Sequence, residues 1–326
     1  MNRHKPLDPA VTPWFAGVPT FLRCPHTRNL SNVDVAIVGI PFDGACTYRP
    51  GARFGPRDVR CQSALSKTYN QFLKVNLFDV LSVIDYGDLD LDPMNIENCY
   101  RTIEKEVAEI IEAGVFPLGV GGDHSISLPI IRALAKKHGP LSMVHFDAHT
   151  DTWDTFLENP YFHGSTFKRA MEEKILAGDS VFQIGLRGGL TSERDYDFAL
   201  KQGVRMITVD ELKQNGLQAV IDELGRLKGL KAYVSLDIDI VDPAFAPGTG
   251  FPEVGGLTSH EIIQLVSGLR ELEIVGFDLV EVLPAHDTAN ITGLLAAHLI
   301  FEFLSVLAVH RQEQSSLAGG NMPCDC

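Results

Sequence analysis

Residues 141–151 read LSMVHFDAHTD, an apolar run that ends in three ligand-type side chains, Asp147, His149 and Asp151. The apolar part has the composition of a strand that is buried on both faces of a parallel sheet. Successive side chains of a strand alternate between its faces, so residues two apart in extended backbone point the same way. We therefore expect an extended segment whose two carboxylates and one imidazole converge on one side.

Two other segments place the same kind of side chain after a strand-like run. These segments are Gly121-Gly122-Asp123-His124 and Asp237-Ile238-Asp239. An acidic pair alone is more often a solvated strand end, but ligand-type residues at the ends of separate strands are hard to explain in that way. Buried carboxylates and imidazoles in so little space repel or stay unpaired without a cation, and two divalent ions that share bridging carboxylates resolve this problem. Carboxylate and imidazole donors without cysteine suit Mn²⁺, and also Ni²⁺, Zn²⁺, Co²⁺ or Fe²⁺.

Strand-like and helix-like segments alternate along the chain. The expected strands are residues 33–39, 115–119, 141–146, 181–186, 204–209, 232–237 and 274–282. The expected helices are residues 104–113, 128–137, 218–227, 259–269 and 294–309. Strands separated by helices indicate an α/β protein with three layers, α/β/α, around a central parallel sheet. In such sheets the loops at the carboxyl ends of the strands build the ligand site, and all three ligand-rich segments fall there.

We find no internal repeat and no linker-like stretch, and we expect a single domain over residues 1–326. The Pro-rich residues 1–32 predict an irregular N-terminal segment, and the Gly- and Ser-rich residues 315–326 predict a mobile tail. The six cysteines are scattered and indicate reduced thiols, so we expect the Cys324-x-Cys326 ending to carry incidental thiols.

Charge and hydropathy exclude several classes of partner. The formal net charge is −14, and an acidic chain repels phosphates, so we expect no nucleic-acid partner. The N-terminus has no signal-peptide pattern, and no apolar run has the length needed to span a membrane. We therefore expect a cytoplasmic protein without a membrane partner.

Taken together, the motifs resemble the ureohydrolase superfamily, which includes arginase and agmatinase. The matching stretches are Gly121–Ser125, His145–Asp151, Ser235–Pro243, Pro247–Gly250, Gly255–Leu257 and Asp278–Val282. The early loop from Arg49 to Arg57 resembles the agmatinase-like branch, and we expect this loop at the rim of the site. The resemblance implies an arginase-like fold and a homo-oligomer, either a trimer or a hexamer.

The resemblance also implies a centre of two divalent ions, Mn²⁺ or Ni²⁺. One ion would be bound by His124, Asp147, Asp151 and Asp237, and the other by His149, Asp147, Asp237 and Asp239. By the same resemblance, His163 handles protons and Glu281 holds the guanidinium group of the substrate. The implied reaction is hydrolysis of a C–N bond of a guanidino compound, which releases an amine together with urea or guanylurea.

Two aromatic residues depart from the pattern of the family. Phe251 stands where a Thr is usual, and Trp153 stands where Asn is frequent. Large rings at both positions would make the pocket smaller and apolar, which suits a compact N-alkylated guanidine or a biguanide such as metformin. Metformin hydrolases of this superfamily use Ni²⁺ and two related subunits, so a hetero-oligomer is a further expectation of this hypothesis.

Several alternatives stay open. An outward-facing Phe251 would instead favour a guanidinobutyrase or an agmatinase. Arg49, Arg53 and Arg187 are candidates for binding a distant substrate carboxylate, but each also suits a structural role. More distant alternatives are a deacetylase-like amide hydrolase with one metal and a non-catalytic partner subunit.

Overall fold

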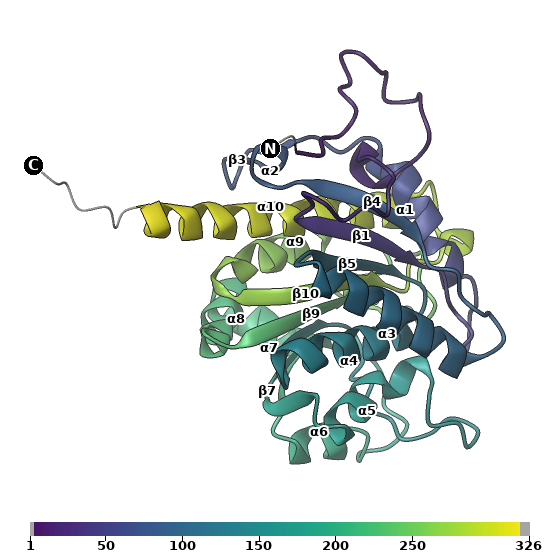
Figure 1. Cartoon of the computed structure of the whole chain (residues 1–326). Coiled ribbons are helices and arrows are strands. Elements are labelled where there is room, and N and C mark those ends of the chain that lie inside the picture. Colours follow the sequence, from purple (N-terminus) through teal and green to yellow (C-terminus); the bar gives the residue numbers. More distant parts are fainter. Residues whose placement is uncertain (1–2, 320–326) are drawn as a thin grey trace, which may run out of the picture.

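Within residues 3–319, which the computed structural model describes, eight parallel strands form one sheet in the order β4-β1-β5-β10-β9-β6-β7-β8 (Figure 1). The strands are β1 (Val35–Ile40), β4 (Val83–Asp88), β5 (Phe116–Gly121), β6 (Leu141–Phe146), β7 (Leu176–Leu186), β8 (Arg205–Thr208), β9 (Lys231–Asp237) and β10 (Glu273–Val280). A separate short antiparallel pair consists of β2 (Tyr69–Asn70) and β3 (Val75–Asn76). Consecutive parallel strands cannot be joined by a tight turn, so the connections between them carry the helices.

Helices cover both faces of the sheet, and α10 and α3 lie on opposite sides of it in Figure 1. One face carries α1 (Gly55–Ser63), α2 (Leu77–Val80), α7 (Val209–Asn215), α8 (Leu217–Leu224), α9 (Ser259–Ser267) and α10 (Ile291–Gly319). The other face carries α3 (Ile96–Glu112), α4 (Ser127–His138), α5 (Thr166–Glu172) and α6 (Asp197–Lys201). The three-layer α/β/α architecture predicted from the sequence is therefore confirmed.

The two cores explain why the strands read as continuous apolar runs. In β1, Val35 and Ile37 face one core, whereas Ala36, Val38 and Ile40 face the other. Because both faces are covered, every residue of β1 is buried, and alternation of apolar with polar residues would leave polar groups in a core.

Each expected strand and helix is present, and most boundaries shift by a few residues, but α3 begins eight residues before the expected helix 104–113 and α10 ends ten residues after the expected helix 294–309. The edge strand β4 was missed, because Asp85, Gly87 and Asp88 interrupt its apolar pattern. Burial of Asp85 is made tolerable by Arg60 of α1, whose Nε lies 2.8 Å from Asp85 Oδ2. A buried acidic side chain whose partner lies on another element is a tertiary feature that local patterns do not reveal.

The expectation that no segment reaches membrane-spanning length was wrong for the C-terminal helix. Residues Ile291–Gln314 of α10 are 24 residues long, and their most apolar 18-residue window has a mean hydropathy of 1.9, which is sufficient by length and composition. However, 78% of the most apolar window of this helix is buried inside the protein, as expected for a core helix. The predicted tail begins within α10, which continues to Gly319, and residues 320–326 with both tail cysteines lie outside the described residues.

The packing of α10 on the sheet generates a stability prediction. Phe303 of α10 is fully buried and stacks on Phe277 of β10, with ring centroids 4.0 Å apart. Phe303→Ala should lower the free energy of unfolding by about 3–5 kcal/mol, because it removes apolar contacts and leaves a cavity. Denaturant unfolding measures this loss, and Phe15→Ala, at a side chain that is 93% exposed, is the matched control. A loss below about 1 kcal/mol for Phe303→Ala would contradict the packing described.

Candidate metal centre

The site lies at the carboxyl ends of four neighbouring strands in the middle of the sheet, β5, β10, β9 and β6. In the register of the sheet, Val280 pairs with Asp237 and Phe146 pairs with Leu236, so these strands end at nearly the same level. The ends of these strands and the segments that follow them carry seven of the eight predicted metal-binding and catalytic residues, and the eighth, His163, lies just before α5. The parallel sheet thus brings together side chains that are far apart in the sequence.

The convergence does not arise from extended backbone, and that part of the prediction was wrong. Strand β6 ends at Phe146, and Asp151 has a positive φ of 50°. After β9, the chain enters a 3-10 turn at Ile238–Ile240, and the Asp237 side chain caps it by accepting a hydrogen bond from the Asp239 amide at 2.8 Å. Side-chain to backbone hydrogen bonds within tight turns therefore aim the polar groups.

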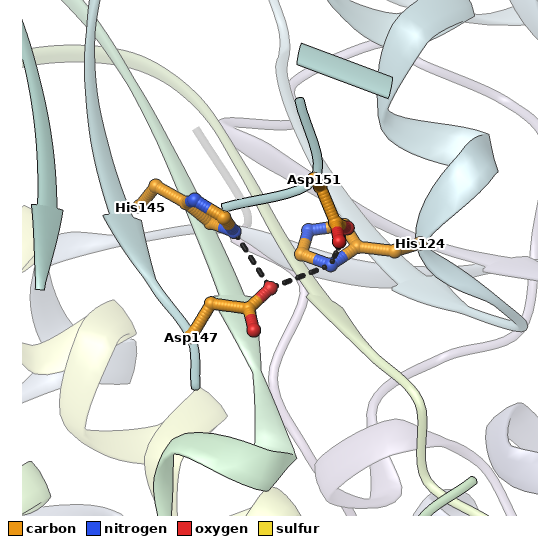
Figure 2. Close-up of side chains that lie close together, drawn as sticks. All are labelled: His124, His145, Asp147 and Asp151. Atoms are coloured by element: carbon orange, nitrogen blue, oxygen red, sulfur yellow. Dashed lines mark hydrogen bonds and ion pairs between the residues drawn. The ribbon is translucent and has the colours of Figure 1, made fainter. Parts of the chain in front are cut away.

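One group of polar side chains surrounds His124, which is fully buried. Its Nδ1 lies 3.1 Å from Asp147 Oδ2, 3.1 Å from Asp151 Oδ2 and 3.2 Å from Asp237 Oδ2. Figure 2 shows Asp147 and Asp151 directed toward this ring from separate points of the loop after β6. Three carboxylates facing one imidazole nitrogen exceed what a single N–H can satisfy.

A second group shares Asp147 with the first. His149 Nδ1 lies 3.0 Å from Asp239 Oδ2 and 3.3 Å from Asp147 Oδ1, whereas Asp147 Oδ2 faces His124. Asp147 therefore presents one oxygen to each group, as a bridging carboxylate would. All six predicted metal-binding side chains are brought together in this way, and subsets of them offer ligand atoms within 4.8 Å of one another.

His145 also lies in this cluster, with Nε2 2.8 Å from Asp147 Oδ2 (Figure 2). The side-chain nitrogen of Gln183, Nε2, lies 2.6 Å from the carbonyl oxygen of Thr150. Because a carbonyl oxygen can only accept, the NH₂ end of the Gln183 side chain must point toward it. The same nitrogen faces His145 Nδ1 at 3.2 Å, and Nδ1 must therefore accept. His145 Nε2 then carries the proton and donates to Asp147, so we assign His145 to orienting this carboxylate rather than to binding a metal.

The electrostatics of the cluster match a site for cations. Burial, followed by the neighbouring carboxylates of Asp239 and Asp147, raises the pKa of Asp237 well above its usual value. Burial opposes the charged form of His124, but Asp147, Asp151 and Asp237 outweigh it and raise the pKa of this ring. Two unit charges about 4 Å apart repel by roughly 4 kcal/mol at an effective dielectric constant of about 20. Oxygen and imidazole donors that are buried, clustered and free of sulfur fit hard or borderline divalent ions, which would remove this repulsion.

A buried polar chain behind His124 fixes the orientation of its ring. His124 Nε2 lies 2.8 Å from Ser235 Oγ, and this hydroxyl donates to Asp278 Oδ1 at 2.7 Å. The other oxygen of Asp278 accepts hydrogen bonds from Ser127, at 2.5 Å, and from Tyr233. Because Nε2 is engaged, Nδ1 faces the carboxylates, as is usual for histidines at metal sites. No role was predicted for Ser235 or Asp278 from the sequence, although an Asp in the apolar strand β10 was a usable signal.

Glu281 and His163 form a pair beside the cluster. Glu281 Oε1 accepts a hydrogen bond from the His124 amide at 2.9 Å and lies 3.4 Å from His163 Nδ1. His163 Nε2 lies 2.8 Å from the hydroxyl of Thr47. Burial lowers the pKa of His163, but the hydrogen bond and charge of Glu281 outweigh this effect and raise it to about 9. At neutral pH the ring is therefore protonated and can donate a proton.

Two polar residues of the site have left-handed backbone. Asp151 has a φ of 50° and Glu281 has a φ of 63°, a region that is uncommon for residues other than glycine. Backbone hydrogen bonds hold both residues in place, because the Phe167 amide donates to the Asp151 carbonyl and the Glu281 amide donates to the Gly122 carbonyl. Such strain is found most often where a side chain must be held in one functional direction.

The two aromatic residues that depart from the family pattern differ in their positions. The Phe251 ring lies edge-on to His149, with centroids 5.7 Å apart, and 6.2 Å from the ring of His163. Trp153 is 41% exposed, and in the described part of the chain no ring contact joins it to the cluster. Phe251 thus borders the site, whereas a role for Trp153 in the pocket remains a prediction.

Comparison with known proteins is consistent with this geometry. A model described as "Arginase family" matches residues 33–305. The chain is 45% identical to a guanidinopropionase of Pseudomonas aeruginosa, over 94% of this chain and 97% of that protein, and 43% identical to a guanidinobutyrase of the same organism, with the same coverage. Among solved structures, proclavaminate amidinohydrolase from Streptomyces clavuligerus superposes with a TM-score of 0.88 at 39% identity, over 92% of this chain and 100% of that one.

The shared carboxylate generates a prediction about metal content. Asp147→Ala and Asp237→Ala should each reduce bound Mn²⁺ from about two ions per chain, because Asp147 presents an oxygen to each group and Asp237 faces His124 in the first group. Elemental analysis after loading and desalting measures this content, and the rise in Tm on adding Mn²⁺ provides a second readout. Glu112→Ala, at an exposed acidic residue at the end of α3, serves as the control. Full metal content in both aspartate variants would rule out this centre.

Proposed function

Because the chain belongs to the arginase family and is a hydrolase of C–N bonds, we propose that it hydrolyses a guanidino compound to urea and an amine with two divalent ions bound at the His/Asp cluster. The observation that carries this proposal is the position of the Glu281 carboxylate, held by the His124 amide directly beside that cluster. An anion next to a metal centre is the arrangement needed to place a planar cation over an activated water. The direct test is product analysis by mass spectrometry with Mn²⁺ or Ni²⁺ and a panel of guanidino substrates.

We propose that His124, Asp147, Asp151, Asp237, His149 and Asp239 hold the two ions. Bound there, Mn²⁺ or Ni²⁺ would supply Lewis acidity that makes water a nucleophile near neutral pH. Asp151, whose carboxylate reaches the first group from a strained backbone, is suited to accept a hydrogen bond from this water and direct it.

The guanidinium group of the substrate would bind at Glu281. Glu281 Oε1 contacts the His124 amide and His163, whereas Glu281 Oε2 faces the backbone of Gly250. A Cβ built on Gly250 would lie 3.3 Å from Glu281 Oε2, so a side chain there would crowd the carboxylate. The absence of a side chain at Gly250 keeps the approach to Oε2 open for a planar cation.

The amine that leaves must take up a proton, and His163 is the donor that we propose. It lies within 3.4 Å of Glu281, where the substrate would bind, and its raised pKa keeps it protonated at neutral pH. After donation, the hydroxyl of Thr47 and the Glu281 carboxylate hold the ring in place for the next cycle. This is general acid catalysis by a positioned imidazolium.

For the substrate, we propose an ω-guanidino acid such as 3-guanidinopropionate or 4-guanidinobutyrate. The support comes from the relatives at 45% and 43% identity, whose names specify such acids. The second candidate is a compact N-alkylated guanidine or a biguanide such as metformin, and it is favoured by the apolar ring of Phe251 at the border of the site. In the substrate panel, urea with an amino acid supports the first candidate, whereas urea with a simple alkylamine, or guanylurea with dimethylamine, supports the second.

The role of His163 predicts a change in turnover without loss of metal. His163→Ala should lower kcat by about 10²–10⁴-fold, the usual contribution of a general acid, while metal content stays at the wild-type level. In the wild type, the rate should fall as the pH rises through about 9, because His163 loses its proton there. The variant should lack this descending limb in the pH profile. An unchanged kcat, or the same limb in the variant, would exclude His163 as the acid.

The position of Phe251 predicts a change in selectivity. Phe251→Thr should raise the ratio of kcat/KM for 4-guanidinobutyrate to that for N-methylguanidine, because it replaces an apolar ring beside His149 with a small hydroxyl group. Steady-state kinetics on both substrates measures this ratio, and Phe245→Thr, at a residue with similar exposure, is the control. Unchanged selectivity would show that Phe251 does not line the substrate pocket.

A further inference from the structure

The two nitrogens of the His163 ring face groups with different hydrogen-bonding abilities. Nδ1 lies 3.4 Å from Glu281 Oε1, and an ionised carboxylate can only accept. Nε2 lies 2.8 Å from the Thr47 hydroxyl and 3.3 Å from the Thr47 backbone amide. Within the described part of the chain, no other hydrogen-bond partner of Nε2 is found. Thr47 thus supplies both groups that face the nitrogen directed away from Glu281.

These two groups of Thr47 favour opposite protonation states of His163. The backbone amide can only donate, so it requires a lone pair on Nε2 and favours a neutral ring with its proton on Nδ1. The hydroxyl can donate or accept, so it can also receive a hydrogen bond from a protonated Nε2. Of the two groups at Nε2, the Thr47 side chain is therefore the one that permits the imidazolium form.

The backbone that carries Thr47 is held in place independently of its hydroxyl. The His163 amide donates a hydrogen bond to the Ala45 carbonyl at 3.1 Å, and the Ala45 amide donates to Asp123 Oδ2 at 2.9 Å. Asp123 is fully buried, so this anchor does not compete with solvent. Removal of the Thr47 hydroxyl should therefore leave the loop next to the His163 ring.

We propose that the Thr47 hydroxyl accepts the Nε2 proton of His163 and thereby keeps this ring in the protonated form from which it acts as the acid. Thr47 is a positioning residue in this inference, which rests on the guanidino-hydrolase function proposed above. When the C–N bond breaks, its electron pair goes to the amine nitrogen, and the Nδ1 proton of His163 moves to that nitrogen. The ring is left neutral, with its remaining proton on Nε2 and bonded to Thr47. The lone pair of Nδ1 then faces Glu281 and takes up the next proton from solvent.

Charged groups from other elements also act on His163. The titratable groups on the elements around it are Glu281 after β10, Asp151 after β6, Asp123 and His124 after β5, Cys46 in the loop of Thr47, and Lys168, Arg169 and Glu172 on α5. Burial lowers the pKa of His163, whereas the carboxylates of Glu281, Asp151 and Asp123 raise it. A change of the Thr47 side chain alone keeps all these groups, so the difference between variants reports on the hydroxyl.

The experiment compares Thr47→Val, Thr47→Ala and Thr47→Ser with the wild type and with Thr102→Val as the matched control. Thr102 is a half-buried threonine of α3, and its hydroxyl donates to the Asn98 carbonyl of the same helix at 3.0 Å. Each full-length enzyme is loaded with Mn²⁺, and kcat is measured from about pH 6 to about pH 10. The substrate is 4-guanidinobutyrate, or N-methylguanidine if the wild type prefers it. Metal content and Tm report whether each variant folds and binds metal.

We expect Thr47→Val to move the descending limb of the pH profile from about 9 to a value about one to two pH units lower. The reason is that the acceptor of the Nε2 proton is lost, whereas the amide that opposes this proton remains. Because the protonated ring is the active form, kcat should be about one tenth of the wild-type value at about pH 8.5 and close to it at about pH 6.5.

The other variants separate the hydroxyl from the shape of the side chain. Thr47→Ala should shift the limb in the same direction as Thr47→Val, because both lack the hydroxyl. Thr47→Ser should restore the wild-type limb, because serine keeps a group that can accept the Nε2 proton. Thr102→Val should leave the profile unchanged.

Two outcomes would overturn the inference about Thr47. One is a descending limb at the wild-type pH in both Thr47→Val and Thr47→Ala. The other is a kcat that falls by the same factor at every pH, which indicates a purely structural role. If Thr47→Val unfolds or loses metal, Thr47→Ala and Thr47→Ser decide by the same criteria. In contrast, a metal-loaded wild-type enzyme that hydrolyses none of the guanidino substrates in the panel would overturn the proposed function itself.

Discussion

The carboxyl groups of Asp147, Asp237 and Asp239 are buried together, and the burial of like charges in a medium of low dielectric constant is unfavourable unless a cation compensates for it. This constraint shapes the rest of the site. The side chains come from two neighbouring strands, β6 and β9, so the sheet must hold these strand ends in register. The two helical layers must also exclude water from the sheet, which is why the strands are apolar on both faces. The need for a cation to compensate the negative charge of the acidic cluster thus links the architecture of the fold to the proposed chemistry.

Besides the contacts within this cluster, neighbouring polar side chains hold its members in place. Ser235 and Asp278 hold the ring of His124 from β9 and β10, and His145 holds Asp147 from β6. Each of these residues is fully buried, so none of their hydrogen bonds competes with solvent. A carboxylate or imidazole held in this way loses little conformational entropy when a cation binds, which favours tight and specific binding.

The sequence predicted the fold class, the positions of most strands along the chain and the convergence of the six polar side chains, because these features depend on local patterns and on the rule that parallel strands place their loops at one edge. It did not predict how the convergence arises. Extended backbone was expected through Asp151, but this residue is in the left-handed region, and Asp239 lies in a 3-10 turn. Such turns depend on hydrogen bonds between side chains and distant amides, for example from the Ala148 amide to Asp239. Ser235 and Asp278 were missed for the same reason, because their partners lie on other strands.

The left-handed backbone at Asp151 and Glu281 has a consequence for how this protein can evolve. Glycine adopts positive φ without steric cost, so a change to glycine at either position would relieve strain in the folded backbone. The same change would remove a carboxylate from the site, and stability and the proposed function are therefore opposed at these two positions. Copies of this protein released from selection for catalysis should lose these two carboxylates early, while the apolar strands beneath them persist. In a descendant with the same fold, the residues at positions 151 and 281 would then indicate whether the catalytic role survived.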